Sequence, residues 1–157
     1  MQTQPLPEAG QMAADFTLPR EDGSQVTLSA LRGGRVVLFT YGQDGTPTCT
    51  TEIRDFQALL PEFVAAGVTV LGLSKDSVEK HRKFAAKEGL GMVLLSDKGG
   101  QVMESWGAYG EKIFFGKPAV GVLRSTFLIG ADGRIEKVWR VEKVKGHAAE
   151  VLAAVKG

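Results

Sequence analysis

Two apolar runs, residues 35–41 and 68–73, constrain the fold of this chain more than any other feature. Each run is rich in β-branched residues and nearly continuous in apolar character, which is typical of central strands covered on both faces. Between them, residues 49–66 place apolar side chains at helical spacing, with polar side chains opposite. A strand, a helix and a strand of these lengths predict a right-handed crossover between two parallel strands.

The next segment continues the alternation of helix and strand. Asp76 or Ser77 can cap a second helix, which Gly89 ends. Residues 92–95 predict a short strand, and residues 99–118 follow as a long central connection without a clear periodicity.

Two further patterns predict hairpins. The pair Asp132-Gly133 separates strand-like runs at residues 125–129 and 134–139, which is a strong hairpin signal. Near the N-terminus, residues 16–18 and 25–27 flank Asp22-Gly23 and predict an added hairpin. A closing helix is expected over residues 147–156. This order predicts an α/β, thioredoxin-like fold with an N-terminal hairpin and a central insertion.

Length and composition exclude several classes of protein. A chain of 157 residues has the size of one domain, so we expect a single domain over residues 1–157, with residues 1–14 as a loose lead-in. Nineteen basic residues against 18 acidic ones give a net charge of +1, which argues against a nucleic-acid binder with a broad basic face. One cysteine excludes an intrachain disulfide, and the two histidines lie in no metal-binding motif. We therefore expect no metal and no cofactor.

The sequence also carries no signal for a membrane. Its N-terminus has neither a basic start nor an apolar run, so we expect no signal peptide. The densest apolar stretch, residues 36–39, is far shorter than the roughly 20 residues that span a bilayer. A soluble, cytoplasmic protein is the expectation.

Cys49 is the residue with the clearest chemical potential. It follows the end of the first long strand and opens the first long helix, at the sheet edge where open α/β folds bind ligands. Thr46 suits the N-cap and Pro47 the first helical position, which places Cys49 in the first turn among unpaired backbone N–H groups. The positive helix end favours a thiolate, and such sites lower a cysteine pKa from about 8.5 to roughly 3.5–7.5.

Arg124 and Thr46 can complete this site. Arg124 opens the strand of the later hairpin and can reach the same edge, where its fork of donors suits a sulfur anion or an oxygen pair. The Thr46 hydroxyl can both donate and accept. Plainer interpretations exist: a lone cysteine is most often a small buried hydrophobe, Arg124 can pair with a surface carboxylate, and Thr46 can be only a cap.

The motifs at residues 46–52 and 124–129 closely resemble those of the peroxiredoxins, in particular the peroxiredoxin Q or bacterioferritin comigratory protein subgroup. Further matches at residues 72–77, 106–117 and 145–148 extend the resemblance over nearly the whole chain.

The resemblance implies a thiol peroxidase that reduces hydrogen peroxide and organic hydroperoxides in antioxidant defence. It implies Cys49 as the peroxidatic cysteine, Thr46 as the hydroxyl partner and Arg124 as the guanidinium. Glu52 either orients that arginine or only stabilises the helix start.

Three positions depart from the subgroup's pattern. Gly42 stands in place of a proline that would stiffen the pocket wall, Thr48 in place of a glycine, and Arg54 where many members carry a resolving cysteine. The resemblance therefore implies a one-cysteine form. Resolution then needs an external thiol, which is thioredoxin, glutaredoxin or a low-molecular-weight thiol, or a Cys49–Cys49 bridge between two chains that are otherwise expected to be monomers.

The same departures support a second hypothesis, in which the chain is a non-catalytic redox sensor or partner-binding module of the same fold. A thioredoxin-type disulfide reductase is less well supported, because the second cysteine that such chemistry needs is absent.

Overall fold

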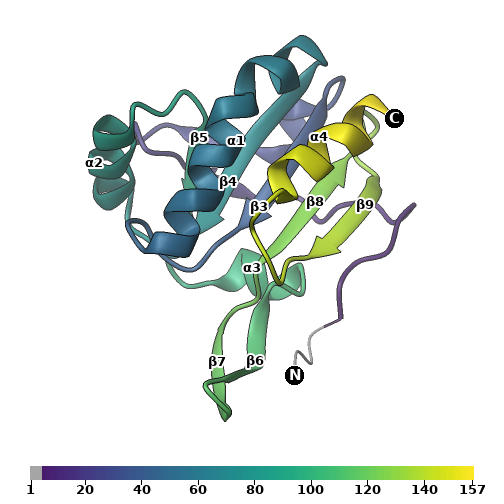
Figure 1. Cartoon of the computed structure of the whole chain (residues 1–157). Coiled ribbons are helices and arrows are strands. Elements are labelled where there is room, and N and C mark those ends of the chain that lie inside the picture. Colours follow the sequence, from purple (N-terminus) through teal and green to yellow (C-terminus); the bar gives the residue numbers. More distant parts are fainter. Residues whose placement is uncertain (1–4) are drawn as a thin grey trace.

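A five-stranded mixed sheet forms the centre of the protein, as a computed structural model that describes residues 5–157 shows (Figure 1). Its strands lie in the order β5-β4-β3-β8-β9. Their bounds are β3 (Arg35–Thr40), β4 (Val68–Ser74), β5 (Val93–Ser96), β8 (Ser125–Ile129) and β9 (Ile135–Arg140).

The predicted crossover is present. Strands β3 and β4 pair in parallel, with Arg35 opposite Val68, and helix α1 (Pro47–Ala65) connects them. Strand β5 extends the parallel part, while β8 and β9 form the predicted antiparallel hairpin beside β3. The prediction of a thioredoxin-like α/β fold with an N-terminal hairpin is confirmed.

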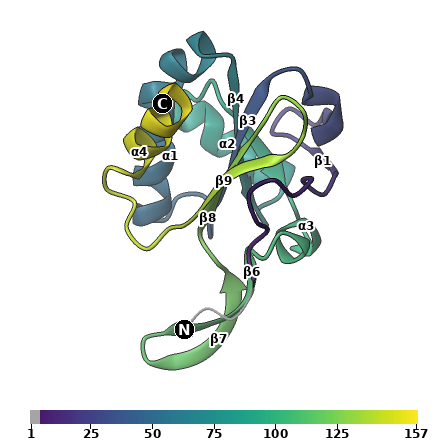
Figure 2. The ribbon, with the colours of Figure 1, turned by 90° about the vertical axis from the view of Figure 1, so that its right-hand side faces the viewer.

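Apolar side chains fill both faces of the sheet because the central strands alternate between them. Val37 of β3 packs under helices α1, α2 (Val78–Glu88) and α4 (His147–Lys156). Its neighbour Val36 faces the opposite core. That core lies under the 3₁₀ helix η1 (Leu28–Leu31), helix α3 (Gln101–Ser105) and the hairpin β1 (Thr17–Pro19)–β2 (Gln25–Thr27), so helices flank the sheet on both sides (Figure 2).

Helix α2 shows which of the two predicted caps is used. The Ser77 side chain accepts a hydrogen bond from the backbone N–H of Lys80 at 3.1 Å. At the other end, Gly89 takes the left-handed conformation with φ +64°. Both ends therefore follow ordinary capping chemistry.

The N-terminal segment is less loose than expected. Residues 1–4 lie outside the described residues, but residues 10–13 make backbone hydrogen bonds with residues 133–135. A side chain at Gly107, which has φ +73°, would clash with the Pro5 carbonyl oxygen. This glycine lets the lead-in pass directly over the protein body.

Part of residues 99–118, expected to be an irregular connection, is regular structure. Helix α3 is followed by a hairpin of β6 (Tyr109–Phe114) and β7 (Lys117–Val122), which projects from the body of the protein (Figures 1 and 2). Its two turn residues, Phe115 and Gly116, both have positive φ. Such turns usually carry Asn-Gly or Asp-Gly, so a phenylalanine at the first position hides the signal.

Over the described residues 5–157, no helix is both long enough and apolar enough to cross a bilayer.

Candidate functional site

Cys49 is the third residue of α1 and lies at the carboxyl edge of the sheet. The chain leaves β3 at Thr40, and Thr46 is still extended, with φ −76° and ψ 149°, before Pro47 begins the helix. The Cys49 side chain is only 3% exposed. Its burial fits the plainer interpretation of a small hydrophobe, so the polar groups around the sulfur decide between the two interpretations.

Arg124 directly precedes β8, and the antiparallel pairing of β8 with β3 brings it beside Cys49. Its Nη2 lies 3.3 Å from Cys49 Sγ, and its Nη1 donates to Glu52 Oε1 at 2.6 Å. The Arg124 side chain is only one-fifth exposed. A positively charged guanidinium that donates to a buried sulfur stabilises the thiolate and does little for a neutral thiol.

Thr46 stands at the N-cap of α1, but its hydroxyl caps no helix N–H. Instead Thr46 Oγ1 donates to the carbonyl oxygen of Gln43 at 3.0 Å. The same hydroxyl is within reach of the Cys49 sulfur, where donation favours the thiolate. Thr46 is therefore the N-cap residue by position, as expected, but its side chain makes no capping hydrogen bond. Its single hydroxyl hydrogen is donated either to the Gln43 carbonyl oxygen or to the sulfur.

Opposing effects set the pKa of Cys49. Burial raises it, because an anion loses its hydration in the protein interior. Hydrogen bonds from the Thr46 hydroxyl, the Gln43 backbone and Arg124, together with the charge of Arg124, lower it. The lowering effects prevail, so the pKa of the thiol lies below its ordinary value and a larger share of the sulfur is ionised at neutral pH.

Glu52 lies one helical turn after Cys49 and is 1% exposed. Burial raises the pKa of Glu52 to about 7, although the charge and hydrogen bond of Arg124 act in the opposite direction. Among the described residues, Glu52 Oε2 has no hydrogen-bond partner, which explains why one 2.6 Å contact on Oε1 does not offset the cost of burial.

The three departures from the resembled pattern have distinct surroundings. A Cβ atom at Gly42 would lie 3.9 Å from Cys49 Sγ, an ordinary contact, so glycine leaves an open position against the sulfur. The Thr48 side chain is exposed. Arg54 binds both carboxylate oxygens of Glu88 on α2, at 2.6 and 3.0 Å. The position of a resolving cysteine is thus occupied by an ion pair between two helices.

A group of buried polar side chains that no sequence pattern indicates lies behind the loop that precedes Cys49. Asp44 is 5% exposed and contacts His81, which is fully buried. His147 begins α4 as expected, and its Nε2 lies 2.8 Å from Thr126 Oγ1. Periodicity shows which face of a helix is apolar, but it does not show which polar side chain lies under that face.

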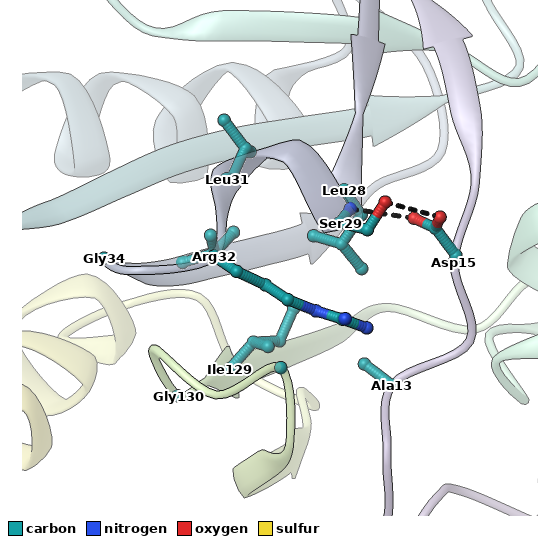
Figure 3. A pocket seen from close by; sticks show the side chains of 11 residues that line it. Ala13, Asp15, Leu28, Ser29, Leu31, Arg32, Gly34, Ile129 and Gly130 are labelled. Atoms are coloured by element: carbon teal, nitrogen blue, oxygen red, sulfur yellow. Dashed lines mark hydrogen bonds between the residues drawn. The ribbon is translucent and has the colours of Figure 1, made fainter.

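A separate surface hollow lies at the far end of β8, beside Ile129, and is not part of the site (Figure 3). There the Asp15 carboxylate accepts from the backbone N–H and the hydroxyl of Ser29, at 2.8 and 2.7 Å. Arg124 directly precedes β8, whereas Ile129 ends it. This hollow and the Cys49 sulfur therefore lie at opposite ends of the same strand.

The chain matches known proteins along most of its length. The family model described as "AhpC/TSA family" matches residues 9–138. The chain is 46% identical to "Peroxiredoxin Bcp" of Xanthomonas campestris, covering 92% of this chain and 91% of the relative. It is 44% identical to "Peroxiredoxin Bcp" of Escherichia coli K12, covering 92% of this chain and 93% of that protein.

Solved structures agree. A structure of Xanthomonas campestris peroxiredoxin Q has a TM-score of 0.85 at 45% identity and covers 90% of this chain and 89% of its own. A structure of the bacterioferritin comigratory protein of the same organism has a TM-score of 0.88 at 42% identity, covering 95% and 98%. The chain belongs to the AhpC/TSA family and is a peroxiredoxin, a thiol peroxidase. Within that family it falls in the subgroup of the Bcp and peroxiredoxin Q proteins.

The buried carboxyl of Glu52 predicts a pH-dependent stability. The folded protein holds the Glu52 proton more tightly than the unfolded chain does, since the pKa rises from 4.5 to about 7. The stabilisation from this group is complete below about pH 4.5 and is lost as the pH rises through about 7, by about 3 kcal/mol in total. Denaturant unfolding of wild type and Glu52→Gln, measured from pH 4.5 to 8.5, checks this.

The expected result is a difference between the two proteins that grows with pH, because the variant lacks the titrating group. Glu79→Gln, at a side chain that is 72% exposed on α2, is the matched control and should follow wild type at every pH. Parallel stability curves for wild type and Glu52→Gln would contradict the assignment.

Proposed function

We propose that this peroxiredoxin reduces hydrogen peroxide and organic hydroperoxides at the thiolate of Cys49. The observation that carries the proposal is the Arg124 guanidinium, which lies 3.3 Å from the sulfur and is held by Glu52 at 2.6 Å. The relative from Xanthomonas campestris supports organic substrates, since its structure is described as giving insight into alkyl peroxide reduction activity.

The chemistry needs a nucleophile and donors for two oxygens. The thiolate attacks one oxygen of the peroxide, a sulfur–oxygen bond forms, and the oxygen–oxygen bond breaks. The sulfur is oxidised to sulfenic acid, and the leaving oxygen takes a proton from water and departs as water or an alcohol. Arg124 and the Thr46 hydroxyl hold the two oxygens in line with Sγ and stabilise the negative charge on the leaving oxygen.

Regeneration of the thiol uses an external thiol in this proposal. The chain has a single cysteine, and Arg54 occupies the position of the resolving cysteine of many relatives. A thiol from thioredoxin, glutaredoxin or a small molecule attacks the sulfenic sulfur, water leaves, and a mixed disulfide forms that a second thiol reduces. We propose a cytoplasmic monomer for this cycle, with a Cys49–Cys49 bridge between two chains as the alternative route.

A sensor is the second candidate function. Gly42 leaves the sulfur without the wall that a proline would supply, and no second cysteine completes a cycle within the chain. A sensor of this kind becomes oxidised stoichiometrically and shows no sustained turnover with any reductant.

Reaction with one equivalent of peroxide tests the site. Wild type should gain one oxygen at Cys49 by mass spectrometry, and Cys49→Ser should neither gain it nor consume peroxide while keeping its fold. Arg124→Ala should slow this step by about 10²-fold or more, because it removes a charged donor from the leaving oxygen. Arg134→Ala, at an arginine more than half exposed and bonded to the Gly10 carbonyl oxygen, is the matched control and should react like wild type. Peroxide consumption by the serine variant would end the proposal.

Turnover separates the enzyme from the sensor. Oxidised protein is offered thioredoxin, glutaredoxin and a small thiol in turn, and the expected result is sustained peroxide consumption with at least one of them. Electrophoresis without reductant shows whether a Cys49–Cys49 dimer accumulates. Oxidation that stops after one equivalent with every reductant would favour the sensor.

A further inference from the structure

Asp44 lies in the loop that carries the hydrogen-bond donors of the sulfur. It follows Gln43, whose backbone forms a hydrogen bond with the Cys49 sulfur. It stands two residues before Thr46, whose hydroxyl donates to the Gln43 carbonyl oxygen at 3.0 Å. Gly42 of the same loop lies directly against the sulfur. A small displacement of this loop therefore changes the surroundings of Sγ without any change in Cys49 itself.

The Asp44 side chain is fully engaged. Its Oδ1 accepts from the Tyr41 hydroxyl at 2.6 Å, and its Oδ2 lies 2.6 Å from His81 Nδ1 on α2. Its backbone N–H donates to Asp76 Oδ2 at 2.8 Å. One residue thus joins the loop to the end of β3, to α2 and to the residues that follow β4.

The histidine is oriented from its other side. His81 Nε2 lies 3.0 Å from the backbone carbonyl oxygen of Leu95 in β5 and 3.5 Å from Ser74 Oγ. A carbonyl oxygen only accepts, so Nε2 carries a hydrogen. The ring is therefore fixed in one orientation, and Nδ1 is turned towards Asp44.

Asp76 and Lys80 extend this group. Asp76 also accepts from Ser74 Oγ at 2.7 Å and pairs with Lys80 at 2.9 Å. Together Asp44, Asp76, Lys80 and His81 form a network of two acids and two bases at the carboxyl edge of the sheet. Asp44, Asp76 and His81 have the spacing of metal ligands, but every ligand atom already has a protein partner, so hydrogen bonding alone accounts for the cluster.

We propose that Asp44, held by Tyr41 and His81, is a positioning residue that fixes the loop of residues 42–46 and so sets the hydrogen bonds that Cys49 receives. Asp44 acts through the loop and does not touch the sulfur. The inference concerns the same sulfur as the proposed function, but its first measurement needs no peroxide.

The sign of the effect separates positioning from a simple charge effect. If Asp44 acted only through its negative charge, removing that charge would favour the thiolate, and both Asp44→Ala and Asp44→Asn would lower the pKa of Cys49. If Asp44 positions the loop, Asp44→Ala disturbs the donors and raises the pKa. Asp44→Asn keeps it near wild type, because an amide can accept from Tyr41 and donate to a neutral His81.

The test follows the ultraviolet absorbance of the Cys49 thiolate against pH, and then the rate constant with hydrogen peroxide. For Asp44→Ala we expect a higher pKa and, below both pKa values, a rate about tenfold lower for each pH unit of that rise. Tyr41→Phe removes one contact only, and a smaller rise in pKa is expected, so the proposal stays testable if the alanine variant fails to fold.

Asp97→Ala is the matched control. Asp97 is similarly buried, but its carboxylate accepts from the Met103 backbone N–H at 2.9 Å, so its loss removes a buried carboxylate that holds α3 and not the loop of residues 42–46. An unchanged Cys49 pKa in folded Asp44→Ala and Tyr41→Phe, a fall in pKa in both Asp44 variants, or a wild-type pKa that responds to a chelator would each overturn the proposal. If the pKa of Cys49 rises in Asp44→Ala but wild type consumes no peroxide, the proposed function is contradicted and the positioning role of Asp44 still holds.

Discussion

The central constraint on this protein is a sulfur that must be an anion inside the protein. Burial by itself keeps a thiol protonated, and Cys49 is almost completely enclosed. The structure opposes burial with donors from two separate places: the loop after β3, which carries Gln43 and Thr46, and Arg124 directly before β8. These two meet because the ends of neighbouring strands lie at one edge of the sheet.

The same arrangement places a cost on stability. Arg124 needs a partner to remain fixed beside the sulfur, and Glu52 supplies one from the interior. One oxygen of that carboxylate is well bonded, while the other has no partner among the described residues. A buried charge with incomplete hydrogen bonding is tolerated where it orients a reacting group, and proteins usually place such strain at functional sites.

The sequence predicts the central strands with their crossover helix, and the position of Cys49, because both depend on local patterns. Continuous apolar runs identified β3 and β4, and the strand-to-helix boundary placed Cys49 in the first turn of α1. Arg124 was within reach by topology, since a strand antiparallel to β3 must begin where β3 ends. The hairpin at β6 and β7 was missed because Phe115 adopts a turn conformation that rarely carries an aromatic residue.

The contacts of Asp44 were out of reach for a different reason. The contact between Asp44 and His81 joins residues 37 positions apart along the chain, and no local pattern encodes such a pairing. Thr46 occupies the N-cap position that its sequence context predicts, but its hydroxyl donates to the nearby Gln43 carbonyl oxygen and accepts from no helix N–H. Local sequence fixes the position of a side chain in an element more securely than it fixes the partner of that side chain.

Two independent links tie helix α2 to the region of Cys49. Arg54 of α1 binds Glu88, the last residue of α2, and Asp44 binds His81 in the first turn of the same helix. A chain with a second cysteine on a distant element must move to join the two sulfurs, because a disulfide needs Cα atoms within about 7 Å. This chain has no such cysteine, so nothing in its own chemistry requires α2 to leave its place. The two links across α2 are then compatible with the proposed cycle, in which an external thiol approaches Cys49 and α2 keeps its place.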